Sequence, residues 1–215
     1  MQAASTRPRR AAKAVTAKRD IILEAATALF LEVGYGDASI NELVSRVGGS
    51  KATVYAHFDN KEGLFEAVVD GLLQELSFAA VHGLRDGIGL REGLTEMGKS
   101  LLGLVMSERH ISLARVVIAE AKRFPALGRI YFEHGPAMAR RGIVDFLARH
   151  LSGDRAKAEE AASWFYSRLL HRWFIERLCR PEFKPKPAAI EQEVAATVEG
   201  LLRLYGGGQG EAGCA

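Results

Sequence analysis

The chain has 215 residues and a mass of 23.4 kDa, which suits one large domain or two small ones. Hydrophobic residues make up 48% and charged residues 26%, a composition that excludes intrinsically disordered and fibrous proteins. The longest apolar stretch, Leu101–Met106, is too short to span a membrane, and no charged-then-apolar leader opens the chain, so we expect a cytoplasmic protein. The two cysteines, Cys179 and Cys214, predict neither a disulfide framework nor a metal site, and no motif indicates a cofactor.

The net charge of +3 is unevenly distributed, because residues 1–19 carry basic side chains and no acidic one. The basic residues of this segment are Arg7, Arg9, Arg10, Lys13, Lys18 and Arg19. Residues 1–15 are predicted to be a disordered arm. A basic arm ahead of a folded domain is typical of DNA-binding proteins, although a solvated tail without a specific partner has the same composition.

The next part of the chain predicts three helices, at 16–33, 40–47 and 51–58, of which the last two are short and joined by a glycine turn. Ser39 and Ser50 are placed to cap the second and third helices. Glu42, three residues after the first of these serines, completes the sequence of a capping box. The apolar faces of the first two helices consist of Ile22, Ala26, Leu29, Phe30 and Val33, and of Ile40, Leu43, Val44 and Val47. Three helices in this order, with a tight turn before the last, indicate a helix-turn-helix.

The rest of the chain is also predicted to be helical, which makes the fold all-α with about nine helices. The further helices are expected at 61–82, 90–106, 109–122, 126–151, 155–179 and 188–205. Pro136 is expected to kink the helix that contains it. The predicted domains are a helix-turn-helix domain at 16–63 and a larger helical domain at 64–205, followed by a flexible tail at 206–215.

Residues 48–62, GGSKATVYAHFDNKE, resemble the recognition-helix signature of TetR-type transcriptional regulators, G-V-S-x-x-T-[LIV]-Y-x-[HY]-F-x-[SN]-K-[ED]. The resemblance covers about residues 16–65, and residues 115–136 resemble the C-terminal ligand-binding domain of the AefR-like subgroup. Two residues depart from the pattern. Gly49 stands where the family usually has a valine that fills the turn, and Val44 replaces a common alanine; we expect these changes to loosen the turn and shift the helix spacing slightly.

The resemblance implies that the third helix enters the major groove of double-stranded DNA, with Val54 and Phe58 in the core beneath it. The implied DNA-contacting residues are Ser39, Asn41, Ser50, Lys51, Ala52, Thr53, Tyr55, His57 and Lys61. Lys61, at the start of the fourth helix, is expected on a phosphate. In the arm, Arg7, Arg9 and Arg10 are expected to reach a minor groove. A solvated Lys51 and a Tyr55 ring packed on the first helix are the structural alternatives.

The resemblance also assigns two roles to the C-terminal domain: binding a small-molecule effector and forming a homodimer. The effector is expected to be largely apolar, and the candidate lining residues are Phe78, Met97, Leu101, Arg115, Tyr131, His134, Met138 and Phe165. The candidate dimer residues are Trp164, Leu169, Trp173, Phe174, Val194, Val198, Leu201 and Tyr205. For both sets, a place in the domain's own core is the alternative.

The sequence therefore predicts a ligand-responsive, DNA-binding transcriptional regulator that is not an enzyme. The family's usual mode is repression, in which a dimer occupies a palindromic operator until an effector releases it; activation is the open alternative. An enzyme is disfavoured because the chain has no nucleophile elbow, phosphate-binding glycine loop, HExxH or CxxC motif. A helical interaction module that has lost DNA binding is disfavoured by the intact polar residues of the third helix.

Overall fold

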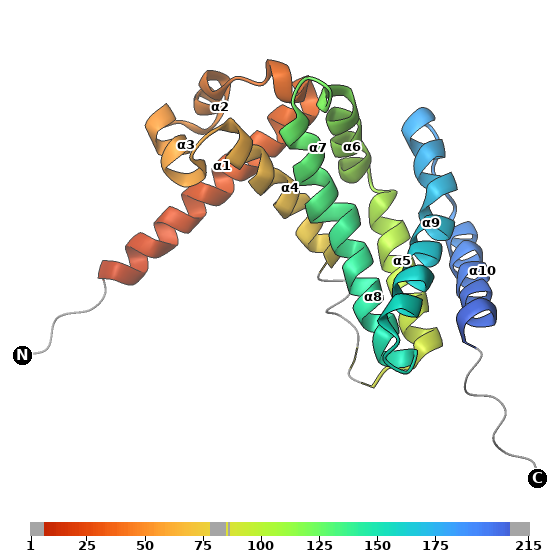
Figure 1. Ribbon diagram of the computed structural model, residues 1–215. Coiled ribbons are helices and arrows are strands. Elements are labelled where there is room, and N and C mark those ends of the chain that lie inside the picture. Colours follow the sequence, from red (N-terminus) through yellow and green to blue (C-terminus); the bar gives the residue numbers. More distant parts are fainter. Residues whose placement is uncertain (1–6, 78–84, 86, 207–215) are drawn as a thin grey trace, which may run out of the picture. The chain divides into compact units, whose positions relative to one another are not determined.

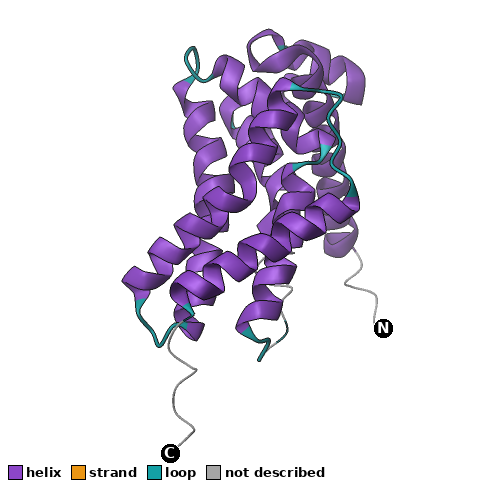
Figure 2. Cartoon of the chain, turned by 90° about the vertical axis from the view of Figure 1, so that its right-hand side faces the viewer, coloured by secondary structure: helices purple, strands orange, loops and turns teal. Residues whose placement is uncertain are grey.

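The computed structural model describes residues 7–77, 85 and 87–206 (Figure 1). Every regular element in these ranges is a helix (Figure 2). The elements are α1 (Arg7–Asp37), α2 (Ile40–Val47), α3 (Lys51–Phe58), α4 (Lys61–Ser77), α5 (Leu90–Val105), α6 (Glu108–Glu120), α7 (Pro125–Phe132), the π-helical turn η2 (Glu133–Ala137), α8 (Met138–His150), α9 (Arg155–Cys179) and α10 (Pro187–Tyr205). With α7, η2 and α8 counted as one helix interrupted by a π-helical turn, the described part of the chain has the nine predicted helices, which confirms the all-α fold.

The regular α-helical bonding changes at the proline for which the sequence predicted a kink. Pro136 sits inside η2, between α7 and α8. Proline has no backbone N–H and its ring crowds the preceding turn, so the regular α-helical bonding cannot continue through it. A wider π-helical turn at this position keeps the chain helical on both sides.

The N-terminal arm differs from its prediction. α1 begins at Arg7, so residues 7–15, which were expected to be disordered, form its first turns. This segment consists mostly of alanine, arginine and lysine, which favour helices. Pro8 lies in the first turn, where its missing N–H leaves no helical bond unmade. The expected tail at 206–215 lies, apart from Gly206, outside the described residues.

The chain divides into two compact units. The first unit contains residues 1–71 and 116–131, and the second contains residues 72–115 and 132–215. The sequence-based boundary at residue 63 differs from this division, because the start of α4 and the end of α6 with α7 belong to the first unit. α4 and α6 therefore each contribute residues to both units.

The first unit has a core built by the helix-turn-helix and the start of α4. Its fully buried side chains include Ile22, Leu29, Phe30, Leu43, Val54, Leu64, Phe65 and Val68. An aromatic cluster lies in this core. The ring centroids of Phe30, Tyr35 and Phe65 are 5.3–5.6 Å apart, and the Phe124 ring lies 4.9 Å from that of Tyr35. The edge-to-face geometry of three of these contacts is favourable for aromatic rings.

The second unit is a bundle in which α9 packs against α5, α8 and α10, and α5 packs against α10. Its buried side chains include Leu94, Met97, Leu102, Phe146, Leu147, Phe165, Leu169, Val194 and Leu201. Gly98 allows α5 and α10 to approach, because a Cβ atom there would lie 2.9 Å from a methyl group of Val194. Among the described helices, none is long and apolar enough to cross a membrane.

Candidate nucleic-acid interface

α2 begins and ends with local contacts that fix the entry to the turn. Ser39 has extended backbone angles, and its hydroxyl accepts a hydrogen bond from the Asn41 N–H at 3.1 Å. The predicted reciprocal half of the capping box is not formed, because the Glu42 carboxylate instead accepts from Arg46 at 2.6 Å. That arginine also pairs with Glu32 on α1 at 2.9 Å, so Arg46 ties α2 to the preceding helix, while Glu42 bonds only within α2.

The turn between α2 and α3 has glycine in a positive-φ conformation at two successive positions. Gly48 has φ +68° and Gly49 has φ +109°, a region that side chains rarely adopt. A valine at residue 49 would be strained in this conformation. Lys18 stabilises the same turn by donating to the carbonyls of Val47 at 2.9 Å and Gly48 at 3.1 Å.

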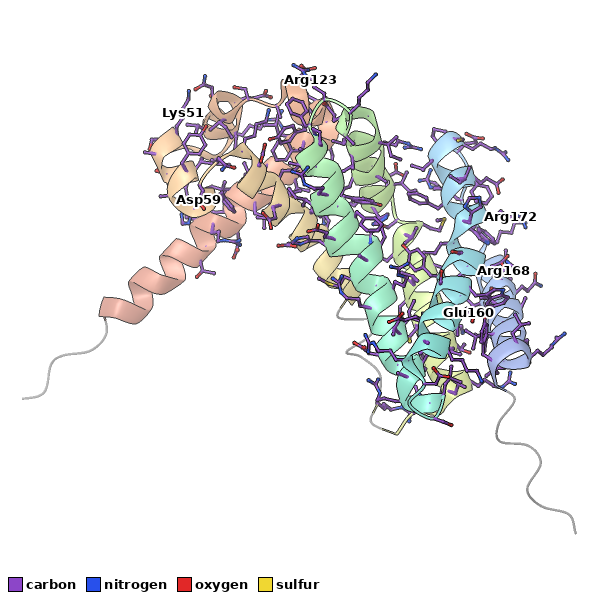
Figure 3. All side chains as sticks on the ribbon, in the orientation of Figure 1. Lys51, Asp59, Arg123, Glu160, Arg168 and Arg172 are labelled. Carbon is purple, nitrogen blue, oxygen red and sulfur yellow. The ribbon has the colours of Figure 1, made fainter. Side chains whose placement is uncertain are left out.

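α3 presents one buried and one exposed face. The Ser50 hydroxyl caps its start by accepting from the Thr53 N–H at 3.2 Å. Val54 and Phe58 are buried, as predicted, and they anchor the helix in the core. On the other side, Lys51, Ala52 and Tyr55 are exposed, whereas Thr53 and His57 are half-buried. Figure 3 labels Lys51 at one end of this helix and Asp59 at the other.

Tyr55 and Lys61 occupy different environments from each other. Tyr55 is 39% exposed, so its side chain is partly covered and partly open to solvent. Lys61 points inward: its ammonium donates to the Gly36 carbonyl at 3.3 Å and lies 4.5 Å from the centre of the Tyr35 ring. Burial lowers the pKa of Lys61, with Glu120 and Asp37 opposing the shift. In this state the lysine supports the end of α1 rather than an outer surface.

The end of α6 joins the first unit through Glu120, a residue to which sequence reasoning gave no role. Its carboxylate accepts from the Gly36 N–H at 2.8 Å, beside Gly34, which has φ +81°. Tyr35 lies between these two glycines and is buried. Burial, with the charges of Glu62 and Glu120, raises the pKa of the Tyr35 hydroxyl to about 12. The Gly-Tyr-Gly sequence predicted the end of a helix, but it gave no indication that Gly36 would bond to Glu120, 84 residues away.

Two residues of the basic segment 1–19 contact α3 or the turn that precedes it. Lys18 holds the turn, and the Arg19 guanidinium lies 5.1 Å from the centre of the Phe58 ring. The side chains of Arg7, Arg9 and Arg10 lie outside the described residues, so their predicted groove contacts stay predictions. Ser39 and Asn41 are exposed at the start of α2.

The candidate effector residues fall in several places. Phe78 lies outside the described residues, and Met97, Leu101 and Phe165 are buried in the core of the second unit. Arg115 donates to the carbonyls of Arg177 at 3.0 Å and Leu178 at 3.3 Å, which satisfies the end of α9. Tyr131 belongs to the first unit, whereas His134 and Met138 belong to the second. The eight candidates are therefore distributed over both units and one position outside the described residues.

Most of the candidate dimer residues are core residues of the second unit. Five of them are buried within it: Leu169, Trp173, Val194, Val198 and Leu201. Three reach the surface in part, namely Trp164, Phe174 and Tyr205. The helical pattern identified apolar residues of α9 and α10 but did not separate the inner face from the outer one. The alternative of a place in the domain's own core holds for the five buried residues.

Two known protein families match this chain, one in its N-terminal part and one in its C-terminal part. Residues 22–68 match the family described as bacterial regulatory proteins of the tetR family. Residues 92–207 match the AefR-like transcriptional repressor C-terminal domain. The first match covers α2, α3 and their turn, and the second covers α5 to α10.

Individual relatives agree with these matches. A protein of Mesorhizobium loti MAFF303099, described as a TetR-family transcriptional regulator, has a crystal structure that is 30% identical with a TM-score of 0.75, covering 94% of this chain and 99% of that one. The flavonoid-responsive regulator FrrA is 28% identical with a TM-score of 0.74, covering 88% and 97%. The HTH-type transcriptional repressor ComR of Escherichia coli K12 is 45% identical over 64 residues, and this match spans only 30% of each chain.

Proposed function

Because the chain belongs to the TetR family of bacterial regulatory proteins, we propose that it is a homodimeric repressor that binds a palindromic operator and is released by a small-molecule effector. DNA-binding transcriptional regulation is the activity of the family, and its members are not enzymes. The finer parts of the proposal are the dimer, the palindrome, the repressing mode and the effector.

The observation that carries the proposal is the two-faced α3. Val54 and Phe58 fix the helix from below, while Lys51, Ala52 and Tyr55 stand on its exposed side. Lysine is a donor for guanine O6 and N7 in the major groove, and a small alanine permits contact with a thymine methyl group. Tyr55 offers a ring to the bases and a hydroxyl to a phosphate. Thr53 and His57, half-buried at the edge of the helix, complete the proposed contacts with the sugar-phosphate backbone.

Polar and basic residues outside the middle of α3 are proposed to add contacts with the phosphates. Ser39, Asn41 and Ser50 offer uncharged polar groups at the starts of α2 and α3, and Lys61 offers a positive charge. Lys61 remains a proposed phosphate ligand only if its ammonium leaves the Gly36 carbonyl when DNA arrives. Lys61→Ala then reduces the salt dependence of operator binding by about one counterion, whereas a lysine that stays inside leaves this slope unchanged.

The first experiment is selection of bound DNA from a pool of random duplexes at moderate salt, followed by sequencing. We expect enrichment of a near-palindrome, because a two-fold dimer presents two copies of α3 to two half-sites. Enrichment of one half-site alone would contradict the dimeric reader. Absence of any enrichment by the folded protein would favour the interaction module that has lost DNA binding.

Replacement of Tyr55 tests the docking of α3 on the selected duplex. Tyr55→Ala is expected to weaken specific binding by about 1–3 kcal/mol, within the range for a lost base-proximal contact. Phe132→Ala is the matched control, since this ring is also exposed, at 56%, but lies on α7. Unchanged operator affinity of the Tyr55 variant, measured by fluorescence anisotropy at one salt concentration, would refute the proposed orientation.

The mode of regulation is tested by a promoter carrying the selected duplex and driving a reporter. Repression predicts that expression of the protein lowers the reporter signal and that Tyr55→Ala restores it. A protein-dependent rise in the signal would instead establish activation. The variant separates an effect of DNA binding from an effect of protein expression, because it is expected to keep the fold.

The proposed effector acts through the second unit. α4 and α6 contribute residues to both units, so a ligand that displaces either helix in the second unit changes the first. The buried apolar side chains of Met97, Leu101 and Phe165 are proposed to line its site. FrrA is named as flavonoid-responsive, so a flavonoid such as naringenin is a reasonable first probe. Release of the operator by this probe supports the proposal; release by apolar probes of other classes would redirect it.

A further inference from the structure

A small pocket lies on the second unit between α8 and α9, two consecutive helices that pack against each other (Figure 1). Its volume is about 290 Å³. α8 contributes Arg140, Arg141 and Val144 to its wall, and the first turns of α9 contribute Arg155 and Glu159. The wall of the pocket is therefore basic, and the contacts of its three arginines decide how much of this charge a ligand meets.

The positive charge of the pocket is only partly neutralised by carboxylates. The Arg155 guanidinium lies 3.2 Å from the Asp145 carboxylate and 3.5 Å from the Glu159 carboxylate. Within the part of the chain that the structure describes, no carboxylate pairs with Arg140 or Arg141. Two of the three guanidinium groups at the pocket thus carry a charge that no acidic side chain balances.

The described contacts of these two arginines leave both guanidinium groups available to a ligand. Arg141 donates to the Glu133 carbonyl at 3.4 Å, a long and therefore weak hydrogen bond. Arg140 lies close enough to α9 for its charge to act on Tyr166: burial raises the pKa of that hydroxyl to about 12, and Arg140 opposes the shift. An anion in the pocket offers both arginines a stronger, charged acceptor than they have without it.

The arrangement of these groups indicates which anion the pocket takes. A guanidinium presents a planar fork of N–H groups that donates two parallel hydrogen bonds to phosphate or carboxylate oxygens. Two neighbouring forks match the three terminal oxygens of a phosphate monoester, whose charge at pH 7 is about −1.5 to −2. Val144, which is 5% exposed, adds an apolar surface for the organic part of such a ligand. The ligand is small, because ligand pockets begin at about 300 Å³.

We propose that this pocket binds a small phosphate monoester, with its phosphoryl oxygens on Arg140 and Arg141 and its aliphatic carbon atoms on Val144. The site is separate from the recognition helix α3 and from the proposed apolar effector site, whose residues are buried inside the bundle. The inference therefore goes beyond the proposed function and does not depend on it.

Binding is tested by isothermal titration calorimetry with the full-length protein, at pH 7.5 and constant ionic strength, with glycerol 3-phosphate as the probe. We expect R140Q/R141Q to raise the dissociation constant at least about tenfold, since the loss of one hydrogen bond to a charged group corresponds to about that factor. Absence of binding to the wild type, or binding to the folded double variant as tight as that to the wild type, would overturn the proposal.

The control for the double variant is Arg149→Gln. It removes a positive charge from an exposed position of the same helix, and Arg149 does not line the pocket. We expect it to leave the dissociation constant unchanged. An equal loss of affinity in this variant would show that the probe responds to the overall charge of α8 and that the pocket is not its site.

Replacement of Glu159 tests the site with an effect of opposite sign. Glu159→Gln removes the acidic side chain from the lining and releases Arg155 from one of its two carboxylates. We expect the probe to bind about threefold more tightly, a modest gain because charge interactions at exposed positions are weak. Glu96→Gln, the same change at an exposed position of α5, is the control and is expected to change nothing. Unchanged or weaker binding by the Glu159 variant would contradict the placement of the phosphate.

The Glu159 variant also keeps the test decisive if R140Q/R141Q does not fold. Far-UV circular dichroism at the calorimetry concentration shows whether the double variant is folded. A gain in affinity cannot result from a damaged fold, so the Glu159 variant then decides on its own.

Two further probes separate the possible ligands of the pocket. Inorganic phosphate offers the same tetrahedral anion without the aliphatic part, and succinate offers two carboxylates instead. Tighter binding of glycerol 3-phosphate than of either supports the contact with Val144 and the phosphate monoester. Equal affinity for inorganic phosphate would mean that the pocket takes the free ion, and tighter binding of succinate would mean that it takes a dicarboxylate; either result overturns the proposed ligand. Because no DNA is present, failure here leaves the proposed repressor intact, and failure of operator selection leaves this site intact.

Discussion

The recognition helix α3 is held at its ends by residues that are close to it in the sequence, whereas the long helix α9 is held by packing against distant helices. α3 has eight residues, and its ends are held by Ser50, three residues from the N–H that it caps, and by the glycine turn before it. α9 has 25 residues and packs against three other helices of the second unit. An isolated eight-residue helix is unstable in water, so α3 depends on its caps and its two anchors. The stability of α9 depends instead on the burial of its apolar face against the neighbouring helices.

The same contrast appears in the charges. In the described part of the first unit, Lys61 is half-buried and Lys51 is exposed. The second unit buries Arg177, which is 2% exposed and pairs with Glu108, and it buries His110, which is 5% exposed. A charged or titratable group in a core makes stability dependent on its protonation state, whereas an exposed one matters more for binding. The pH dependence of stability is therefore expected to arise mainly in the second unit, whereas charge changes at the exposed Lys51 are expected to alter operator affinity.

The largest expected effect is the loss of a core side chain from α9. Leu169→Ala is expected to lower the free energy of unfolding by about 2–5 kcal/mol, because the leucine is fully buried and its removal leaves a cavity. The control is Ile118→Ala on α6, where the side chain is 62% exposed. Urea denaturation at one protein concentration measures both. Equal losses from the two variants would show that Leu169 is not the core residue that its burial indicates.

The next effect is the pH dependence that His110 gives to the second unit. Burial lowers the pKa of this imidazole to about 4, from an ordinary value of 6.5. The unfolded chain therefore binds the proton first as the pH falls, and stability present above pH 6.5 is lost progressively down to pH 4. The loss is expected to reach about 3 kcal/mol, since each unit of pKa shift corresponds to about 1.4 kcal/mol.

His110→Gln removes this titration and keeps a polar side chain at the position. The free energy of unfolding is measured by urea denaturation at several values between pH 7 and pH 4. Carboxylates contribute to both proteins alike, so the difference between the two curves isolates the histidine. Parallel curves over that interval would mean that the imidazole is not shielded from solvent in the folded protein.

The two regions also differ in how well the sequence predicted them. The capped, anchored α3 was predictable because its signals lie within a few residues: Ser50, the glycine pair, and Val54 and Phe58 one helical turn apart. In α9 and α10 apolar residues occur on more than one face, and only packing with α5 and α8 decides that Leu169 and Val194 point inward. Glu120 was missed for a similar reason, since its partner Gly36 is close only after folding. The inward turn of Lys61 likewise depends on a tertiary contact.

A smaller effect is expected at the turn before α3. Gly49→Val introduces the residue usual in the family at φ +109°, a backbone conformation that costs a side-chain-bearing residue about 1–3 kcal/mol. Both the free energy of unfolding and the operator affinity are expected to fall. Gly103→Ala on α5 is the control, because a Cβ atom there has open space and a helical backbone. Unaltered stability of the valine variant would show that the turn adopts another conformation in solution.

The smallest effect is that of the cap on α3. Ser50→Ala removes the acceptor for the Thr53 N–H and is expected to cost about 1 kcal/mol. Ser45→Ala is the control, because that hydroxyl donates to the Asn41 carbonyl inside α2 and caps nothing. Amide hydrogen exchange of Thr53 and Val54 reports the cap directly. If exchange accelerates at these two amides while the second unit keeps its protection, the recognition helix opens on its own. If the second unit loses protection equally, α3 instead unfolds only with the whole chain.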